Sequence, residues 1–254
     1  MPSTVPRPLP YDGHVSVVVP VRDEADNVEP LIDEIHRALE GRADFEVVYV
    51  DDGSSDGTTQ KLAALRTRFE RLRVVRHGES CGQSMALRSG VRAARHAWIA
   101  TLDGDGQNDP ADIPRLLAML DDTRVTQQRL GLIAGWRTQR HDTALRRLSS
   151  RVANRVRGTL LKDATPDTGC GLKVFSREVF LAVPFFDHVH RFLPALFLRE
   201  GCTVVSVPVA HRERQSGRSK YGLFDRLWVG IVDLLGVAWL QRRMKRPQLE
   251  AGPP

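Results

Sequence analysis

The chain has 254 residues, 41% of them hydrophobic and 27% charged, which excludes a disordered or fibrous protein and leaves enough apolar residues for a full core. Its 37 basic residues exceed its 31 acidic ones, and the net charge of +6 favours anionic partners such as phosphates, nucleic acid or a membrane surface. No run approaches the roughly 20 apolar residues of a membrane-spanning helix, and the Pro-rich first residues do not resemble a signal peptide.

Strands and helices alternate along the first half of the chain. Short apolar or β-branched runs predict strands, at residues 15–20, 45–50, 72–76, 98–102 and 132–136. Apolar residues at helical spacing predict helices between them, at residues 28–39, 58–69, 84–94 and 113–120. This alternation predicts an α/β domain whose Rossmann-like, mostly parallel sheet is flanked by helices. Residues 1–13 precede the domain and are expected to be a disordered lead-in.

Polar loops follow three of the expected strands, at residues 22–27, 51–56 and 103–107. In doubly wound sheets, ligands bind outside the carboxyl ends of the strands, so these loops are expected to gather on one rim. Three acidic strand ends would rarely coincide for purely structural reasons. The sequence therefore predicts a ligand site at this rim.

The stretch Asp103-Gly-Asp105 places two carboxylates just past the end of a buried strand. Gly104 and Gly106 let the backbone turn sharply, and Gln107 follows. Carboxylate and amide oxygens suit a hard divalent cation that also carries phosphate oxygens. The alternative is a turn that is merely rich in Asp and Gly, which the neighbouring polar loops make less favourable.

The composition becomes basic after residue 136. Residues 137–157 contain arginines with few acidic residues to balance them, namely Arg137, Arg140, Arg146, Arg147, Arg151, Arg155 and Arg157. If residues 143–157 form a helix, Arg147, Arg151 and Arg155 share one face, which is either a solvated surface or a phosphate site. Further elements are expected in chain order: a strand within 167–175, a helix at 190–199, a strand at 202–211, a basic loop at 212–221 and a helix at 223–243.

Several motifs together resemble the inverting family 2 glycosyltransferases. They are Val19-Pro20 with Glu24 and Asn27, residues 50–58 (VDDGSSDGT) and Asp103-Gly-Asp105. Two later stretches, residues 169–175 (GCGLKVF) and 211–220 (HRERQSGRSK), are similar to the dolichol-phosphate mannosyltransferase branch and its bacterial polyprenyl-phosphate relatives. The resemblance extends over residues 14–240 and keeps the order and spacing of the motifs.

The resemblance implies a GT-A fold in residues 14–222, with a nucleotide-sugar half (14–136) and an acceptor half (137–222). It implies a GDP- or UDP-linked sugar donor bound through Mg²⁺ or Mn²⁺. The metal ligands would be Asp103, Asp105 and Gln107. The nucleoside pocket would be lined by Pro20, Arg22, Glu24 and Asp52, with Asp51 as the alternative to Asp52. Arg22-Asp23 departs from the Tyr-Asn of many relatives, which leaves the base contacts open.

The same resemblance implies a polyprenyl phosphate, undecaprenyl or dolichyl, as the acceptor. An ionised phosphate needs cations more than it needs a general base. The expected catalytic residues are Asp105 together with the phosphate-binding residues Arg137, Arg147, Arg151, Arg214 and Lys220. Arg146 and Arg147 are not separable by sequence, although helix phase favours Arg147.

Two alternatives stay open. A family 2 enzyme with a carbohydrate hydroxyl acceptor would need a base, and Asp167 is the carboxylate in a suitable motif; with a phosphate acceptor, Asp167 is expected to have a structural or donor-positioning role. A non-catalytic nucleotide-sugar or nucleic-acid binder is the second alternative. Aromatic residues are only 6% and no nucleic-acid motif is present, so no nucleic-acid partner is expected.

Residues 223–246 predict a C-terminal amphipathic helix with a basic end, and residues 247–254 a disordered tail. An apolar stripe followed by basic residues is typical of a helix at an anionic membrane surface, although packing on the domain's own core is as compatible. Cys81, Cys170 and Cys202 lack metal or redox spacing, so reduced thiols are expected. Together these features predict a cytoplasmic protein that is peripheral on the cytoplasmic face of the membrane.

Overall fold

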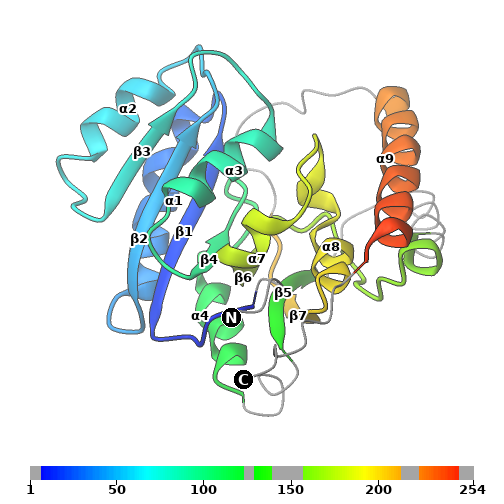
Figure 1. The fold of residues 1–254 in the computed structure, drawn as a ribbon. Helices are drawn as coiled ribbons and strands as arrows, with labels where there is room; N and C mark the ends of the chain where they lie inside the picture. Colours follow the sequence, from blue (N-terminus) through cyan, green and yellow to red (C-terminus); the bar gives the residue numbers. More distant parts are fainter. Residues whose placement is uncertain (1–6, 123–128, 139–156, 213–222, 246–254) are drawn as a thin grey trace, which may run out of the picture.

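The computed structural model describes residues 7–122, 129–138, 157–212 and 223–245, with the side chains of 223–229 left out (Figure 1). Seven strands form one sheet in the order β3-β2-β1-β4-β6-β5-β7. The strands are β1 (His14–Val21), β2 (Asp44–Asp51), β3 (Leu72–Arg76), β4 (Trp98–Thr101), β5 (Leu130–Arg137), β6 (Lys173–Ser176) and β7 (Thr203–Val209). Every neighbouring pair is parallel except the two that β6 makes, so the expected mostly parallel sheet is confirmed.

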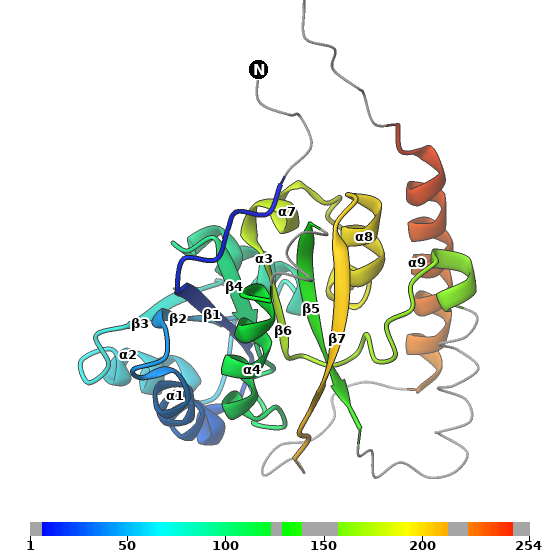
Figure 2. The same ribbon diagram turned by 90° about the horizontal axis from the view of Figure 1, so that it is seen from below.

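Helices cover both faces of the sheet (Figure 2). One face carries α1 (Ala25–Leu39), α2 (Thr58–Leu65) and α4 (Ile113–Leu117), the last flanked by 3₁₀ turns at Pro110–Asp112 and Ala118–Leu120. The other face carries α3 (Gln83–Ala93), α7 (Arg177–Ala182), the 3₁₀ turn Val189–Arg191 and α8 (Leu193–Arg199). The outermost helix is α9 (Leu223–Arg243), which packs on α8.

Two hydrophobic cores follow from the alternation of side chains along the buried strands. Val17 and Val19 of β1 face the core beneath α1, α2 and α4, whereas Val18 faces the core beneath α3, α7 and α8. All three valines are completely buried. The consecutive β-branched residues that predicted a strand buried on both sides therefore serve two separate layers.

Some elements differ from the sequence expectation in length. α2 ends at Leu65 and not near residue 69, because the chain tightens into turns in which the Thr67 amide donates to the Ala64 carbonyl (3.2 Å) and the Arg68 amide to the Leu65 carbonyl (3.0 Å). The strand expected within 167–175 begins only at Lys173, because Gly171 is packed against the loop after β4 and outside the ladder. Residues 7–13, expected to be disordered, lie on the domain: the indole N–H of Trp98 donates to the Leu9 carbonyl (3.0 Å).

The C-terminal helix α9 buries one side and exposes the other. Val237 and Ala238 are buried against the α8 side of the domain, whereas Leu235 and Trp239 are 59% and 58% exposed. None of the helices described is long and apolar enough to cross a membrane.

Candidate active site

The polar loops after β1 and β2 contact one another at the rim where these strands end. The Asp23 amide donates to Ser54 Oγ (2.9 Å), and the Ser55 amide donates to Asp23 Oδ1 (2.8 Å). The loop after β4 lies next to them, because a Cβ on Gly104 would overlap Val21 and come 3.1 Å from the Pro20 carbonyl. The three loops therefore meet at one rim, as their positions in the sequence predict.

Asp52 is buried at the rim and holds the loop before α3. Its carboxylate accepts from His77 Nδ1 (2.7 Å), Ser80 Oγ (2.8 Å) and the amides of Cys81 (2.8 Å) and Gly82 (2.9 Å). Burial opposes ionisation, but these donors hold the pKa of Asp52 below its ordinary value. Asp52, His77 and Cys81 also offer ligand atoms within 4.8 Å of one another, although the Asp52 oxygens are already engaged by hydrogen bonds.

The neighbouring side chains in the expected nucleoside pocket have different partners. Asp51 turns into its own loop and accepts from the Ser54 amide (2.9 Å) and Thr59 Oγ1 (2.5 Å). Glu24 accepts from Asn27 Nδ2 (2.6 Å) at the start of α1. Arg22 is half exposed and donates to Ser80 Oγ (2.9 Å), on the same loop that Asp52 holds. Asp52 and Arg22 thus converge on residues 77–82, whereas Asp51 serves the turn.

A cavity of about 350 Å³ lies below this rim. Its lining includes Pro20, Gln83, Asp103, Gly171, Lys173 and His190. These residues come from β1, α3, the loop after β4, the loop before β6, β6 itself and the 3₁₀ turn before α8. Gln83 Nε2 donates to Asp103 Oδ1 (2.9 Å), so α3 and the loop after β4 are joined at the mouth of the cavity.

Asp103 and Asp105 form an oxygen-rich pair next to the cavity. Burial, and then the charge of Asp105, raise the pKa of Asp103. Asp105 Oδ1 accepts from the Gln107 amide (3.2 Å). Two carboxylates that repel each other suit a hard dication, whose charge would relieve the repulsion. The residues present therefore fit Mg²⁺ or Mn²⁺.

Gly171 permits the close packing of the loop before β6 on Asp103. A Cβ at residue 171 would overlap the Asp103 carboxylate and lie 2.7 Å from Asn108 Oδ1. Asn108 in turn accepts from the Asp103 amide (3.3 Å). Residue 171 is therefore a glycine because there is no room for a side chain, and not because of an unusual backbone angle.

We expect Gly171→Ala to displace Asp103 and so to weaken metal-dependent donor binding, while the protein still folds. The overpacking should lower the free energy of unfolding by about 1–3 kcal/mol. Urea denaturation and Mn²⁺-dependent nucleotide binding measure the two effects. Gly230→Ala, at an open position on α9, is the control; it should leave donor binding unchanged and should not lower the free energy of unfolding, because alanine is the better helix former. Donor binding that is unchanged in Gly171→Ala would contradict the role given to this contact.

Arg137, which is partly buried at the end of β5, forms an ion pair with the buried Asp167. Arg137 Nε and Nη2 donate to Asp167 Oδ2 (2.7 Å) and Oδ1 (2.9 Å). Burial opposes the charge of Arg137, but the bonds to Asp167 and its negative charge raise the pKa of the guanidinium. The structure thus joins two residues for which the sequence suggested separate roles, and both oxygens of the candidate base are occupied.

Two lining residues were not assigned as site residues from the sequence. Lys173 is 4% exposed, and its Nζ donates to the Cys170 carbonyl. His190 Nδ1 lies 2.8 Å from Ser84 Oγ, and burial, then the charge of Lys173, lowers the pKa of His190 to about 3. A lysine inside an otherwise apolar strand was the available signal for Lys173. His190 is separated from α3 by about a hundred residues, so no local signal marks it.

The low pKa of His190 predicts a specific loss of stability in acid. The folded form keeps the ring neutral, whereas the unfolded chain takes up a proton below pH about 6.5. Stability is therefore lost as the pH falls from about 6.5 towards 3, by up to about 1.4 kcal/mol per pH unit. We expect His190→Asn, which retains a group near Nδ1, to lose less stability than the unaltered chain between pH 7 and 5 in urea melts. Equal losses would contradict the buried, neutral imidazole.

Four of the expected phosphate-binding residues, Arg147, Arg151, Arg214 and Lys220, lie outside the described residues. Residues 157–212 are the main part of the expected acceptor half that the structure describes. Arg157 is buried, donates to the Thr165 carbonyl (2.5 Å) and lies 3.7 Å from Asp163. The Arg212 amide donates to the Gln107 carbonyl (2.9 Å), which brings the start of the basic loop next to the Asp103–Gln107 segment.

A mostly parallel sheet with paired carboxylates beyond a strand end is the arrangement in which α/β domains bind ligands at the carboxyl rim of the sheet. The chain belongs to glycosyl transferase family 2, whose family model matches residues 16–183. It is 35% identical over 241 residues to a dodecaprenyl-phosphate galacturonate synthase of Rhizobium johnstonii, covering 92% of this chain and 69% of the relative. It is 34% identical to an undecaprenyl-phosphate 4-deoxy-4-formamido-L-arabinose transferase of Enterobacter sp., covering 87% and 66%.

Solved structures share the fold at lower identity. A mannosyl-3-phosphoglycerate synthase from Rubrobacter xylanophilus has a TM-score of 0.68 and 21% identity, covering 95% of this chain and 78% of that one. A mannosyltransferase from Pyrobaculum calidifontis, in complex with GDP-Man and Mn²⁺, has a TM-score of 0.63 and 24% identity, covering 97% and 69%. The expected GT-A architecture is confirmed by these likenesses.

Proposed function

We propose that this chain transfers a sugar from a nucleotide-diphospho-sugar to a polyprenyl phosphate, with inversion in a single displacement. The observation that carries the proposal is the arrangement at the rim. The paired carboxylates Asp103 and Asp105, which suit a metal bound to a diphosphate, lie at a cavity. The candidate general base, Asp167, is occupied by its two bonds to Arg137. The polyprenyl-phosphate names of the curated relatives support the acceptor class. Because the chain spans only about two thirds of their length, the acceptor and the sugar are part of the proposal.

The donor would bind with its diphosphate at Asp103, Asp105 and Gln107, and its nucleoside towards Pro20, Arg22, Glu24 and Asp52. A bound Mg²⁺ or Mn²⁺ would supply positive charge that stabilises the leaving diphosphate. Gln83 fixes Asp103 through the 2.9 Å bond, so one ligand is oriented before the donor arrives. The nucleotide in the solved neighbours is GDP- or UDP-linked, and either base is compatible with the proposal.

The acceptor's ionised phosphate oxygen would attack the anomeric carbon, and the bond from that carbon to the diphosphate would break with its electron pair leaving on the nucleoside diphosphate. No proton has to be removed from the acceptor, so no base is required. Asp167 is held by two bonds to Arg137, which agrees with this reaction better than with a hydroxyl acceptor. Arg137, together with Arg147, Arg151, Arg214 and Lys220, would offset the negative charge of the two substrates.

Peripheral contact with the cytoplasmic face of a membrane is part of the proposal. A polyprenyl chain stays in the bilayer, so the enzyme has to reach the phosphate at the surface. The exposed apolar side of α9, followed by Arg242, Arg243 and Lys245, has the composition of a helix that lies at an anionic interface.

Thermal unfolding with a panel of UDP- and GDP-sugars, with and without Mn²⁺, tests donor binding. A ligand that binds only the folded state raises the melting temperature with concentration. We expect one base class to stabilise the protein in a strictly metal-dependent way and Asp105→Ala to remove the shift. A panel without any metal-dependent shift would contradict the proposed donor site.

A further inference from the structure

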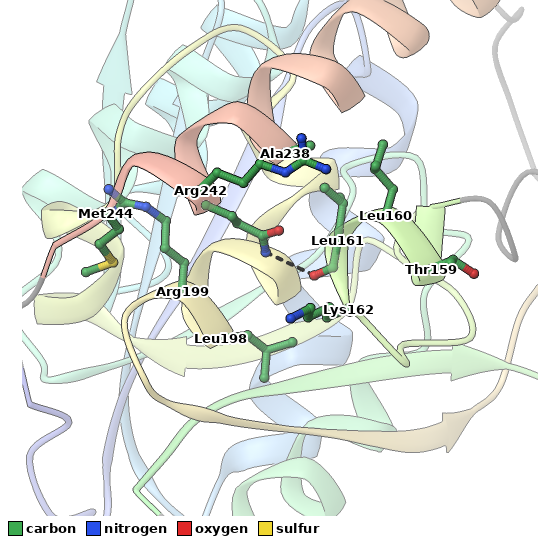
Figure 3. A pocket seen from close by; sticks show the side chains of 10 residues that line it. Thr159, Leu160, Leu161, Lys162, Leu198, Arg199, Ala238, Arg242 and Met244 are labelled. Atoms are coloured by element: carbon green, nitrogen blue, oxygen red, sulfur yellow. Dashed lines mark hydrogen bonds between the residues drawn. The ribbon is translucent and has the colours of Figure 1, made fainter.

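A groove separate from the rim cavity lies beside the C-terminal end of α9 (Figure 3). Its volume is about 1100 Å³, and it is bounded by residues 159–162, the end of α8 and the last turns of α9. Leu160, Leu161, Leu198, Ala238 and Met244 give it an apolar floor. Gln241 Nε2 ties α9 to the Leu161 carbonyl (3.0 Å) across the groove. No lining residue is shared with the cavity below the rim.

The polar part of the groove is cationic. Of the ten described residues that line the groove, Lys162, Arg199 and Arg242 are charged and none is acidic. Arg199 is paired with Glu200 and also faces the Leu240 carbonyl (3.4 Å), so its charge is compensated within the fold. Lys162 and Arg242 are both exposed. Within the part of the chain that the structure describes, no acidic side chain pairs with Lys162 or Arg242. An apolar floor with two such cations matches a ligand that has an anionic head and a hydrocarbon tail.

Lys162 occupies a backbone position that favours glycine. Its φ is +54°, in the left-handed region, directly after the helical residues 157–161. The Asp163 amide donates back to the Gly158 carbonyl (3.2 Å), which is the closing bond of a glycine-type helix end. A lysine there is disfavoured by its Cβ.

The groove continues into the exposed side of α9. Leu235 and Trp239 lie on that side, and Arg242 follows one turn later on the same stripe while also lining the groove. The Arg243 guanidinium lies over the Trp239 ring at 5.9 Å. A surface that contacts a bilayer through Leu235 and Trp239 would therefore present the groove to the lipid headgroups.

We propose that the groove between α8, α9 and residues 157–162 binds an anionic membrane phospholipid, with its phosphate on Lys162 and Arg242 and acyl carbons on the leucine floor. The site rests on the proposed membrane contact, but it is separate from the sugar-transfer site and is not an acceptor subsite. The charge of the groove and its continuity with the exposed stripe favour a phospholipid over a second copy of this basic chain.

Lys162→Gly is the sharpest variant, because glycine suits the backbone while removing the ammonium. The measurement is co-sedimentation of the full chain with phosphatidylcholine vesicles that contain or lack phosphatidylglycerol. We expect an unchanged or higher melting temperature and about fivefold weaker binding to the anionic vesicles, the change that corresponds to about 1 kcal/mol per basic residue at such a surface. Unchanged vesicle binding by Lys162→Gly would overturn the proposal.

Arg242→Gln and Arg243→Gln form a matched pair, since both are exposed on the last turn but only Arg242 lines the groove. Arg242→Gln should weaken binding at least as much as Lys162→Gly, and Arg243→Gln clearly less. Equal effects would show a diffuse charged surface and overturn the groove. Inorganic phosphate at millimolar concentration should not displace the vesicles; displacement would identify a free-phosphate site and contradict the lipid.

Sugar transfer to a short-chain polyprenyl phosphate in detergent separates the two proposals. Lys162→Gly should retain this transfer, because the groove is outside the rim site. Its loss in the variant would place the groove in the acceptor path and overturn the assignment. If the unaltered chain transfers no sugar at all, the vesicle result still decides the groove independently.

Discussion

Asp105→Ala is expected to reduce sugar transfer by about a thousandfold or more while leaving the fold intact. The carboxylate is one of the two charges that would hold the metal and its diphosphate, and removing such charge stabilisation typically costs this much. The fold should persist because Asp105 lies on the partly exposed rim and not in either core. Initial rates with saturating donor and acceptor, and circular dichroism, measure the two effects.

Asp121→Ala is the matched control for this variant. It makes the same substitution at an exposed aspartate that lies outside the rim loops. It should transfer at the normal rate. Near-normal turnover by Asp105→Ala, in a preparation free of the unaltered enzyme, would show that the paired carboxylates are not the centre of the site.

Arg137→Ala is expected to lower the free energy of unfolding by about 3–5 kcal/mol, because it leaves the buried Asp167 carboxylate without its cation. The free energy of unfolding of Arg137→Lys should fall between those of the unaltered chain and Arg137→Ala, since one ammonium group does not replace the two parallel bonds of the guanidinium. Urea denaturation measures the series. A loss below about 1 kcal/mol in Arg137→Ala would show that the pair is effectively solvated.

Asp167→Asn separates the two acceptor classes. In the proposed reaction Asp167 orients Arg137 and takes no proton, so the variant should bind donor normally and keep most of its turnover after correction for stability. With a hydroxyl acceptor, turnover would be lost while donor binding persisted. The pH profile adds a readout: if Asp167 were the base, the acidic limb of the rate would disappear in Asp167→Asn.

The layout of the sheet and the position of the rim were predictable because both follow from local signals. β-branched runs gave the strands, and Asp103-Gly-Asp105 at a strand end gave the candidate metal pair. A strand within residues 167–175 was predicted, but the antiparallel direction of β6 was not. Its late start follows from Gly171, which packs on the loop after β4.

The hydrogen-bond partners of the rim carboxylates could not be predicted from the sequence. Asp52 was expected at the nucleoside, and its four bonds to residues 77–82 depend on a loop about 28 positions away. Arg137 and Asp167 appeared as independent candidates, yet the fold pairs them across 30 positions. Such pairings depend on how the loop before β6 folds back onto the end of β5. Neither spacing nor residue type encodes this.

The most direct test of the account is transfer of radiolabel from a nucleotide-sugar to undecaprenyl phosphate, followed by extraction into organic solvent. We predict label in the organic phase that requires Mg²⁺ or Mn²⁺, is abolished by chelation, and is absent with Asp105→Ala. No extractable label across a broad panel of UDP- and GDP-sugars, from protein that binds one of them in the presence of metal, would contradict the polyprenyl-phosphate acceptor.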